Sequence, residues 1–378
     1  MSDSTASGHK ASATSHVADG AQRFVLLDGL RGLAAFAVIL DHVPGGVLGD
    51  LLPGRYLAVD FFFVLSGFVL AHAYGRRLEQ GWSPLSFMTA RLIRLYPMYL
   101  LSLALGLALS VIGLLRGWVG PTWSDVLTTA GLGLLFLPAP PMAGFGGGAL
   151  YPFNGPAWSL FFELIANLVY ALVARFLSWR ALGAVLVVGA VAVVFTINRH
   201  AGTGGPGWLW EHFDAGLARV MFDFFAGVTI HRVWAGKRLP ALPWWAALIA
   251  FLLVIAVPAE GMWRTVYDSA AALILMPTLV ALSAGSRVTG SVARLCSTIG
   301  LLSYGVYVIH VPLFATLGGA AAAAHVQLGG GPWLAVLVAG LAAVLAAISY
   351  VAFDRPLRIW LSARAREANV RNTPGERG

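Results

Sequence analysis

The chain has 378 residues, of which 58% are hydrophobic and 11% are charged, and its mean hydropathy is +0.77. A soluble globular domain carries about a quarter charged residues, so this composition excludes an ordinary soluble protein and indicates a polytopic membrane protein. The net charge of +8 leaves nucleic-acid binding to be considered, while the single cysteine, Cys296, excludes an internal disulfide and a thiolate zinc site.

A polar segment opens the chain and a series of apolar runs follows it. Residues 1–23 are rich in Ser, Ala, Gly and Thr and have no apolar stretch, so we expect a disordered cytoplasmic tail rather than a signal peptide. The apolar runs have about 18 to 22 residues, the length of membrane-spanning helices, whereas a β-barrel alternates in segments of about 10. The predicted fold class is all-α, a polytopic membrane helix bundle of about ten transmembrane helices. The expected spans are 27–48, 56–74, 96–115, 157–175, 181–198, 217–234, 241–258, 266–284, 299–318 and 333–353.

The positions of the basic residues orient this bundle. Ten spans place both termini on one side, and 20 of the 25 Lys and Arg residues fall on that side. Because basic residues gather on the cytoplasmic side of membrane proteins, we expect both termini in the cytoplasm. The positive charge then reflects topology, and no nucleic-acid partner is expected. Residues 24–360 form the expected membrane domain, and residues 361–378 a basic cytoplasmic tail.

One apolar segment does not fit the series of spans. Residues 124–138 are short and end at a proline, and a span there would invert the charge bias of everything that follows. We interpret them as a re-entrant or interfacial segment on the outer side. The Pro/Gly-rich residues 138–156 come next and are too long and irregular for a tight turn, so we expect a loop that lines an acceptor cleft.

Ionisable residues within spans are functional candidates because charge is costly in hydrocarbon. Arg31 and His42 are eleven residues apart, which places them on one face of the first span and about 16 Å apart along it. Asp41 precedes His42. In the fourth span Glu163 is expected near the depth of His42 and is its expected partner. A structural alternative stays open, in which Arg31 reaches the lipid headgroups and His42 is a packing residue.

Other spans carry further polar residues. Asp223 lies one turn from Arg219 and could pair with it. Arg91 and Arg94 are three residues apart on one helix face, which suits either a phosphate-binding site or an anchor at the cytoplasmic surface. Gly67, next to Ser66 in the second span, allows a ligand or another helix to approach closely. The ninth span carries a polar seam, and the fourth begins with an aromatic residue of the kind found at membrane surfaces: Tyr304, Tyr307, His310 and Trp158.

A cationic cytoplasmic rim and an outer histidine with nearby carboxylates suggest a donor that enters from the cytoplasm. Acyl-CoA has the matching shape, with phosphates at one end and a thioester on a long arm. On this hypothesis Arg31, Arg91 and Arg94 hold the nucleotide phosphates, and His42 is the general base that activates an acceptor hydroxyl. Asp41 or Glu163 would orient the imidazole and stabilise its charged form.

The sequence resembles the acyltransferase-3 family of bacterial integral-membrane O-acyltransferases over about residues 24 to 357. LDGLRGLAAFAVILDH resembles the family signature of a basic residue, a ten-residue gap and a histidine, and carries its essential roles onto Arg31 and His42. Four further segments resemble family motifs and follow in the family's order: FFFVLSGF, RLIRLYP, PAWSLFFE and SYGVYVIHVPL. A fifth segment, RVMFDFFAGV, resembles a family motif at its Arg, Phe and Gly. Many members have Glu at the positions of Asp223 and Asp354 and a second acid at Leu164.

The resemblance implies an acyltransferase with acyl-CoA as the donor substrate, acetyl-CoA being expected, and with no permanently bound cofactor or metal. The catalytic candidates are His42, Asp41 and Glu163, and Arg31, Arg91 and Arg94 are the donor-binding candidates. The substrate-binding candidates are Trp158, Ser66, Tyr304, Tyr307 and His310. The expected acceptor is a hydroxyl of a surface glycan or its lipid-linked precursor, with glycan-assembly proteins as candidate partners at the bacterial inner membrane. Two alternatives remain, acylation of a macrolide-like small molecule and, in a different class, a proton-coupled transporter or flippase.

Overall fold

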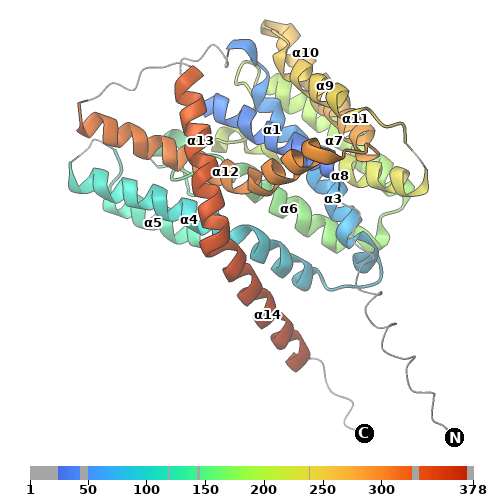
Figure 1. Cartoon of the computed structure of the whole chain (residues 1–378), viewed down its shortest axis with the longest axis horizontal. Helices are drawn as coiled ribbons and strands as arrows, with labels where there is room; N and C mark the ends of the chain where they lie inside the picture. The colour runs from blue at the N-terminus through green and yellow to red at the C-terminus, as the bar shows by residue number, and fades with distance from the viewer. Residues whose placement is uncertain are drawn as a thin grey trace, which may run out of the picture.

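The computed structural model describes residues 24–42, 50–117, 120–142, 145–237, 239–325 and 332–372 (Figure 1). The structure is 82% helical and has no β-strand in these ranges, which confirms the all-α fold class. The expected N-terminal tail, 1–23, lies outside the described residues.

Helices follow one another along the described chain, and the stretch between α5 and α6 contains only a short 3-10 turn. The first half contains α1 (Val25–His42), η1 (Arg55–Leu57), α3 (Ala58–Glu79), α4 (Pro84–Leu115), α5 (Trp123–Leu134), η2 (Gly146–Gly148), α6 (Ala157–Val173), η3 (Ala174–Phe176) and α7 (Trp179–Arg199). The second half contains η4 (Trp210–His212), α8 (Phe213–Gly236), α9 (Trp244–Ala256), α10 (Gly261–Ala270), η5 (Ala271–Leu275), α11 (Met276–Ala284), α12 (Gly290–Ala323), α13 (Pro332–Ser349), η6 (Tyr350–Asp354) and α14 (Arg355–Asn372).

Seven helical segments of the described chain are long and apolar enough to cross a membrane. They are Arg55–Glu79, Pro84–Leu115, Ala157–Phe176, Trp179–Arg199, Gly261–Ala284, Gly290–Ala321 and Trp333–Glu367. The other three predicted spans coincide with α1 and α8, which carry several charged residues, and with α9, which has only 13 residues. The count of ten spans and the cytoplasmic placement of the termini stay predictions.

The segment 124–138 contains a helix too short to cross a bilayer. Helix α5 has 12 residues and would span about 18 Å, against a hydrocarbon thickness of about 30 Å. It begins with a capping box, in which Thr122 accepts from the backbone N–H of Asp125 and the Asp125 carboxylate accepts from the N–H of Thr122. This short helix agrees with the expectation that 124–138 does not form a full span.

Glycines let the central helices approach one another closely. A Cβ at Gly67 of α3 would lie 1.9 Å from the carbonyl oxygen of Phe224, and one at Gly227 of α8 would lie 2.0 Å from that of Val64. Helices α1 and α12 are in similar contact at Gly300, where a Cβ would lie 2.6 Å from the Cβ of Asp28. Small residues at such crossings are typical of packed membrane helices.

A buried ion pair also joins α3 to α8. Arg219 binds Asp60 through two parallel hydrogen bonds of 2.8 Å and also donates to the carbonyl oxygen of Pro206. The expected pair between Arg219 and Asp223 is therefore wrong. The Arg219 guanidinium faces Asp60 on the neighbouring helix, because both carboxylate oxygens of Asp60 can accept from it at once. It does not pair with Asp223, which lies one turn along its own helix.

Candidate active site

Among the cavities of the described residues, one is lined by arginines and another by a histidine. The arginine cavity has a volume of about 210 Å³ and is lined by Arg31, Arg91 and Arg94 together with polar and apolar side chains of α3, α6 and α12. The histidine cavity has a volume of about 630 Å³ and is lined by His42 and Asp41. Helix α1 contributes to both, which agrees with the predicted separation of Arg31 and His42 along one helix.

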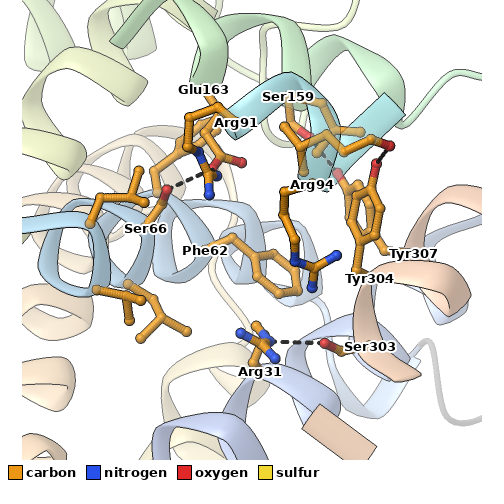
Figure 2. Close-up of a pocket in the computed structure, with 16 residues that line it drawn as sticks. Arg31, Phe62, Ser66, Arg91, Arg94, Ser159, Glu163, Ser303, Tyr304 and Tyr307 are labelled. Atoms are coloured by element: carbon orange, nitrogen blue, oxygen red, sulfur yellow. Dashed lines mark hydrogen bonds and ion pairs between the residues drawn. The ribbon is translucent and has the colours of Figure 1, made fainter. Parts of the chain in front are cut away.

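Arg31 is held at the α1–α12 contact. Its Nε donates to Ser303 Oγ at 2.9 Å, and an Nη donates to the carbonyl oxygen of Gly300 at 2.6 Å. The same guanidinium forms an ion pair of 3.1 Å with Asp28, three residues earlier on α1. These contacts fix the Arg31 side chain on the wall of the arginine cavity (Figure 2).

Glu163 also belongs to the arginine cavity. Its Oε1 accepts from Arg91 at 2.8 Å and from Ser66 Oγ at 2.6 Å. The predicted pairing of Glu163 with His42 is therefore wrong. Both acid and histidine were placed at a similar depth, but packing of α6 against α4 brings Glu163 to Arg91, which is a stronger partner than a neutral imidazole.

Arg94 differs from the two other arginines of this cavity. Within the described part of the chain it makes no hydrogen bond and no ion pair, and its guanidinium carbon lies 5.3 Å from the centre of the Tyr304 ring. Figure 2 shows its side chain directed into the cavity beside Phe62. An arginine without an internal acceptor, facing a cavity, is available to bind an anionic group of a ligand.

Of the described residues, one has a side chain on the walls of both cavities. The Tyr307 hydroxyl lies 2.6 Å from Ser159 Oγ and donates to the carbonyl oxygen of Pro156 at 3.3 Å. Ser159 faces the arginine cavity, whereas Pro156 and Trp158 face the histidine cavity. The Ser159–Tyr307 pair is thus the partition between the two spaces.

His42 is held by its Nδ1 atom. This nitrogen lies 2.9 Å from the carbonyl oxygen of Val38 and 3.3 Å from Nε2 of His310. The expectation that Asp41 or Glu163 orients the imidazole is not met, since Asp41 forms an ion pair of 3.1 Å with Arg55. The second histidine takes that position, and it lines neither cavity although we expected it to contact substrate.

Aromatic side chains and glycine-rich loops form the rest of the histidine cavity. The predicted cleft-lining loop does line it, through residues from Gly146 to Pro156. Tyr151 of this loop donates to the carbonyl oxygen of Phe136 at 2.9 Å, and burial raises the pKa of its hydroxyl, so it stays protonated. The other tyrosine and tryptophan rings on the wall are those of Tyr56, Trp158, Trp208 and Tyr307. Such a wall suits a ring-shaped acceptor with hydroxyl groups.

Several lining residues were not predicted. Arg55, Tyr56, Arg264 and Trp208 face the histidine cavity, and so do Gly204 and Gly205. Tyr56 donates to Asp268 at 2.6 Å, and Arg264 forms an ion pair of 3.4 Å with the same acid. A signal was present in the glycine-rich stretch GTGGPG at 202–207, where Gly205 has a φ of +80° and a Cβ would lie 2.7 Å from the Tyr56 ring.

Comparison with known proteins gives a family match and several relatives. The model of an acyltransferase domain family, acyltransferase-3, matches residues 24–352. Protein 2 of the picA locus of Rhizobium radiobacter is 44% identical over 46% of this chain and 94% of its own length. The exopolysaccharide production protein ExoZ of Rhizobium meliloti is 28% identical over 79% of this chain and 88% of its own. The acyltransferase MdmB of Streptomyces mycarofaciens is 28% identical over 55% and 57%. No solved structure matches.

Proposed function

Because the chain belongs to the acyltransferase-3 family and is a multi-pass membrane acyltransferase, we propose that it moves an acyl group from cytoplasmic acyl-CoA to a glycan hydroxyl across its two cavities. Acetyl-CoA is the proposed donor, and the bacterial inner membrane is the proposed location. The observation that carries the proposal is the partition at Tyr307, which has a cationic space on one side and the imidazole of His42 on the other.

The arginine cavity is the proposed donor site. Three guanidiniums and one carboxylate face it, so its net charge is positive and attracts the phosphates of acyl-CoA. Of the three arginines, Arg94 is the one that we propose binds a phosphate of acyl-CoA, because it makes no hydrogen bond or ion pair within the described residues. The apolar wall, formed by residues such as Phe62, Leu65 and Leu160, suits the extended arm that carries the thioester.

The histidine cavity is the proposed acceptor site. In the proposed transfer the thioester end of the donor's arm meets the acceptor hydroxyl at the Tyr307 boundary between the two cavities. His42 takes the proton of the acceptor hydroxyl while the hydroxyl oxygen bonds to the acyl carbon. The thioester carbon–sulfur bond then breaks, and the CoA thiolate takes the proton from His42. The overall products are an O-acyl ester and CoA.

A glycan is the proposed acceptor on two grounds. The histidine cavity has tryptophan and tyrosine rings beside polar side chains, a combination that binds sugar rings. ExoZ, a relative that covers 79% of this chain, is an exopolysaccharide production protein. Acylation of a macrolide-like small molecule is the second candidate. The chain is also similar to the acyltransferase MdmB, over 55% of its length.

Acyl-CoA turnover by purified protein in lipid nanodiscs tests the division between the two cavities. We expect His42→Ala to lose CoA release by about a hundredfold or more while its affinity for acyl-CoA is kept. Arg94→Gln is expected to raise the KM for acyl-CoA about tenfold, since one charge-assisted hydrogen bond contributes about 1.5–3 kcal/mol. Arg180→Gln, at an exposed arginine of α7, is the matched control. A folded His42→Ala variant that releases CoA like the wild type would overturn the proposal.

A further inference from the structure

His310 contacts the proposed base, yet the transfer described above does not use it. Its side chain is fully buried in α12 and faces neither the arginine cavity nor the histidine cavity. Its ring centre lies 4.9 Å from that of His42, and its Nε2 is 3.3 Å from His42 Nδ1. A buried polar ring in this position takes part in a hydrogen-bond network, and its proton positions can be worked out.

The protons of His310 follow from its two neighbours. Its Nδ1 lies 2.8 Å from the carbonyl oxygen of Tyr307, and a carbonyl oxygen only accepts, so this nitrogen carries the proton. Full burial disfavours a doubly protonated ring because its charge would be desolvated. The neutral ring therefore presents an unprotonated Nε2, which is an acceptor, toward His42.

The tautomer of His42 then follows in turn. Its Nδ1 faces two acceptors, Nε2 of His310 at 3.3 Å and the carbonyl oxygen of Val38 at 2.9 Å. Nδ1 can hydrogen-bond to these acceptors only as a donor, so a neutral His42 ring carries its proton on Nδ1. Nε2 of His42 is consequently the unprotonated nitrogen, and only this atom can take a proton from an acceptor hydroxyl.

We propose that His310 is a positioning residue, which holds His42 as the Nδ1-protonated tautomer and stabilises the imidazolium that forms during transfer. This inference rests on the proposed function. When Nε2 of His42 takes the hydroxyl proton, its Nδ1–H becomes a charged donor to Nε2 of His310, and a charge-assisted hydrogen bond is about twice as strong as a neutral one. The proton leaves again to the CoA thiolate, so His310 itself neither gains nor loses one.

The titratable and charged groups around this pair come from four elements. Tyr307 and His310 belong to α12, Asp41 to α1 itself, Arg55 and Tyr56 to η1, and Arg264 to α10. Asp41 and Arg55 are paired with each other, and Arg264 with Asp268. A change at position 310 leaves these pairs in place, so its effect on the pH profile reports the histidine contact.

Two substitutions separate an acceptor from a packing role. His310→Gln places an amide oxygen where Nε2 lies, whereas His310→Leu fills a similar volume without an acceptor. We expect His310→Leu to lower kcat at least about tenfold with an unchanged KM for acyl-CoA, and His310→Gln to restore most of it. The acidic limb of the kcat profile should move to lower pH in His310→Leu, because the imidazolium has lost its acceptor. His231→Leu, in the His72–His231 pair outside both cavities, is the control.

The outcomes distinguish this inference from the proposed function. If His42→Ala is inactive while His310→Leu keeps the wild-type kcat and pH profile, the positioning role is wrong and the proposed function stands. If the wild type releases no CoA, or if His42→Ala releases CoA as fast as the wild type, the proposed function itself is wrong. Should His310→Leu not fold, His310→Gln is compared with His310→Asn, whose shorter amide reaches Tyr307 but not His42. Equal rates in those two variants would overturn the inference.

Discussion

At the scale of single residues, the arginine cavity is positively charged because three guanidiniums and one carboxylate, that of Glu163, face it. Residue types and helix positions predicted that Arg31, Arg91 and Arg94 share a cationic site, and one cavity holds all three. Partner choice was predicted poorly. Glu163 pairs with Arg91 instead of His42, because side-chain partners depend on which helices are neighbours, and spacing within one helix carries no such information. For the same reason the contact between His42 and His310, 268 residues apart, was not foreseen.

The Glu163–Arg91 pair leads to a prediction about donor affinity. Glu163→Gln keeps an acceptor for Ser66 but removes the negative charge from the arginine cavity. One charge about 10 Å from a phosphate contributes about 1.7 kcal/mol at an effective dielectric of 20, so the KM for acyl-CoA should fall by roughly ten- to twentyfold. Steady-state kinetics with varied acyl-CoA checks this.

A matched control separates local charge from general effects. Glu79→Gln removes an equally arginine-paired but half-exposed carboxylate, 3.2 Å from Arg232 and outside both cavities, and should leave the KM unchanged. An unchanged KM with a large loss of kcat in Glu163→Gln would contradict the prediction and would place the carboxylate in the transfer step itself.

Helices were predicted better than contacts between helices. Over the residues that the structure describes, which end at 42 for the first span, the predicted spans coincide with helical segments. Run length and hydropathy are properties of the local sequence, which explains this agreement. The helix boundaries differ from the predicted ones where capping residues extend a helix beyond its apolar run. Helix α4 begins at Pro84 rather than at residue 96, since Ser83 caps the helix and Pro84 suits its first turn. Glycines at helix crossings were visible in the sequence, but the partner of each glycine was not.

The crossing of α3 and α8 leads to a stability prediction. Gly67→Ala places a methyl group 1.9 Å from a backbone oxygen, and backbone atoms yield only if the two helices move apart. Overpacking of this kind costs about 1–3 kcal/mol or more, and separation also strains the Arg219–Asp60 pair. We expect a lower thermal unfolding midpoint in nanodiscs. Gly183→Ala on α7, where a Cβ would meet nothing within 4 Å, should be neutral or slightly stabilising. Equal midpoints would show that the crossing is looser than described.

At the scale of the whole molecule, the arrangement of the two cavities matters more than either one alone. Helix α1 carries Arg31 into the first cavity, and α12 supplies Tyr307 at the boundary between the two (Figure 2). The same helix α1 carries His42 into the second cavity. Composition and hydropathy predicted a helical membrane bundle, and motif order predicted its family. The partition between the cavities could not be predicted from the sequence, because it depends on how α6 and α12 meet at Ser159 and Tyr307.

The partition leads to a prediction about coupling between CoA release and acyl transfer. A barrier that excludes water protects a thioester from hydrolysis, and Tyr307→Ala would join the two cavities and let water from one reach the other. The ratio of CoA released to acyl group transferred should then rise at least about threefold above the wild-type ratio near one. Tyr307→Phe loses the hydrogen bond to Ser159 but keeps the ring, so its ratio should stay close to that of the wild type. Parallel assays of free CoA and acylated acceptor give the ratio, and the thermal midpoint confirms folding. A folded Tyr307→Ala variant that remains fully coupled would mean that a different part of the protein keeps water from the thioester.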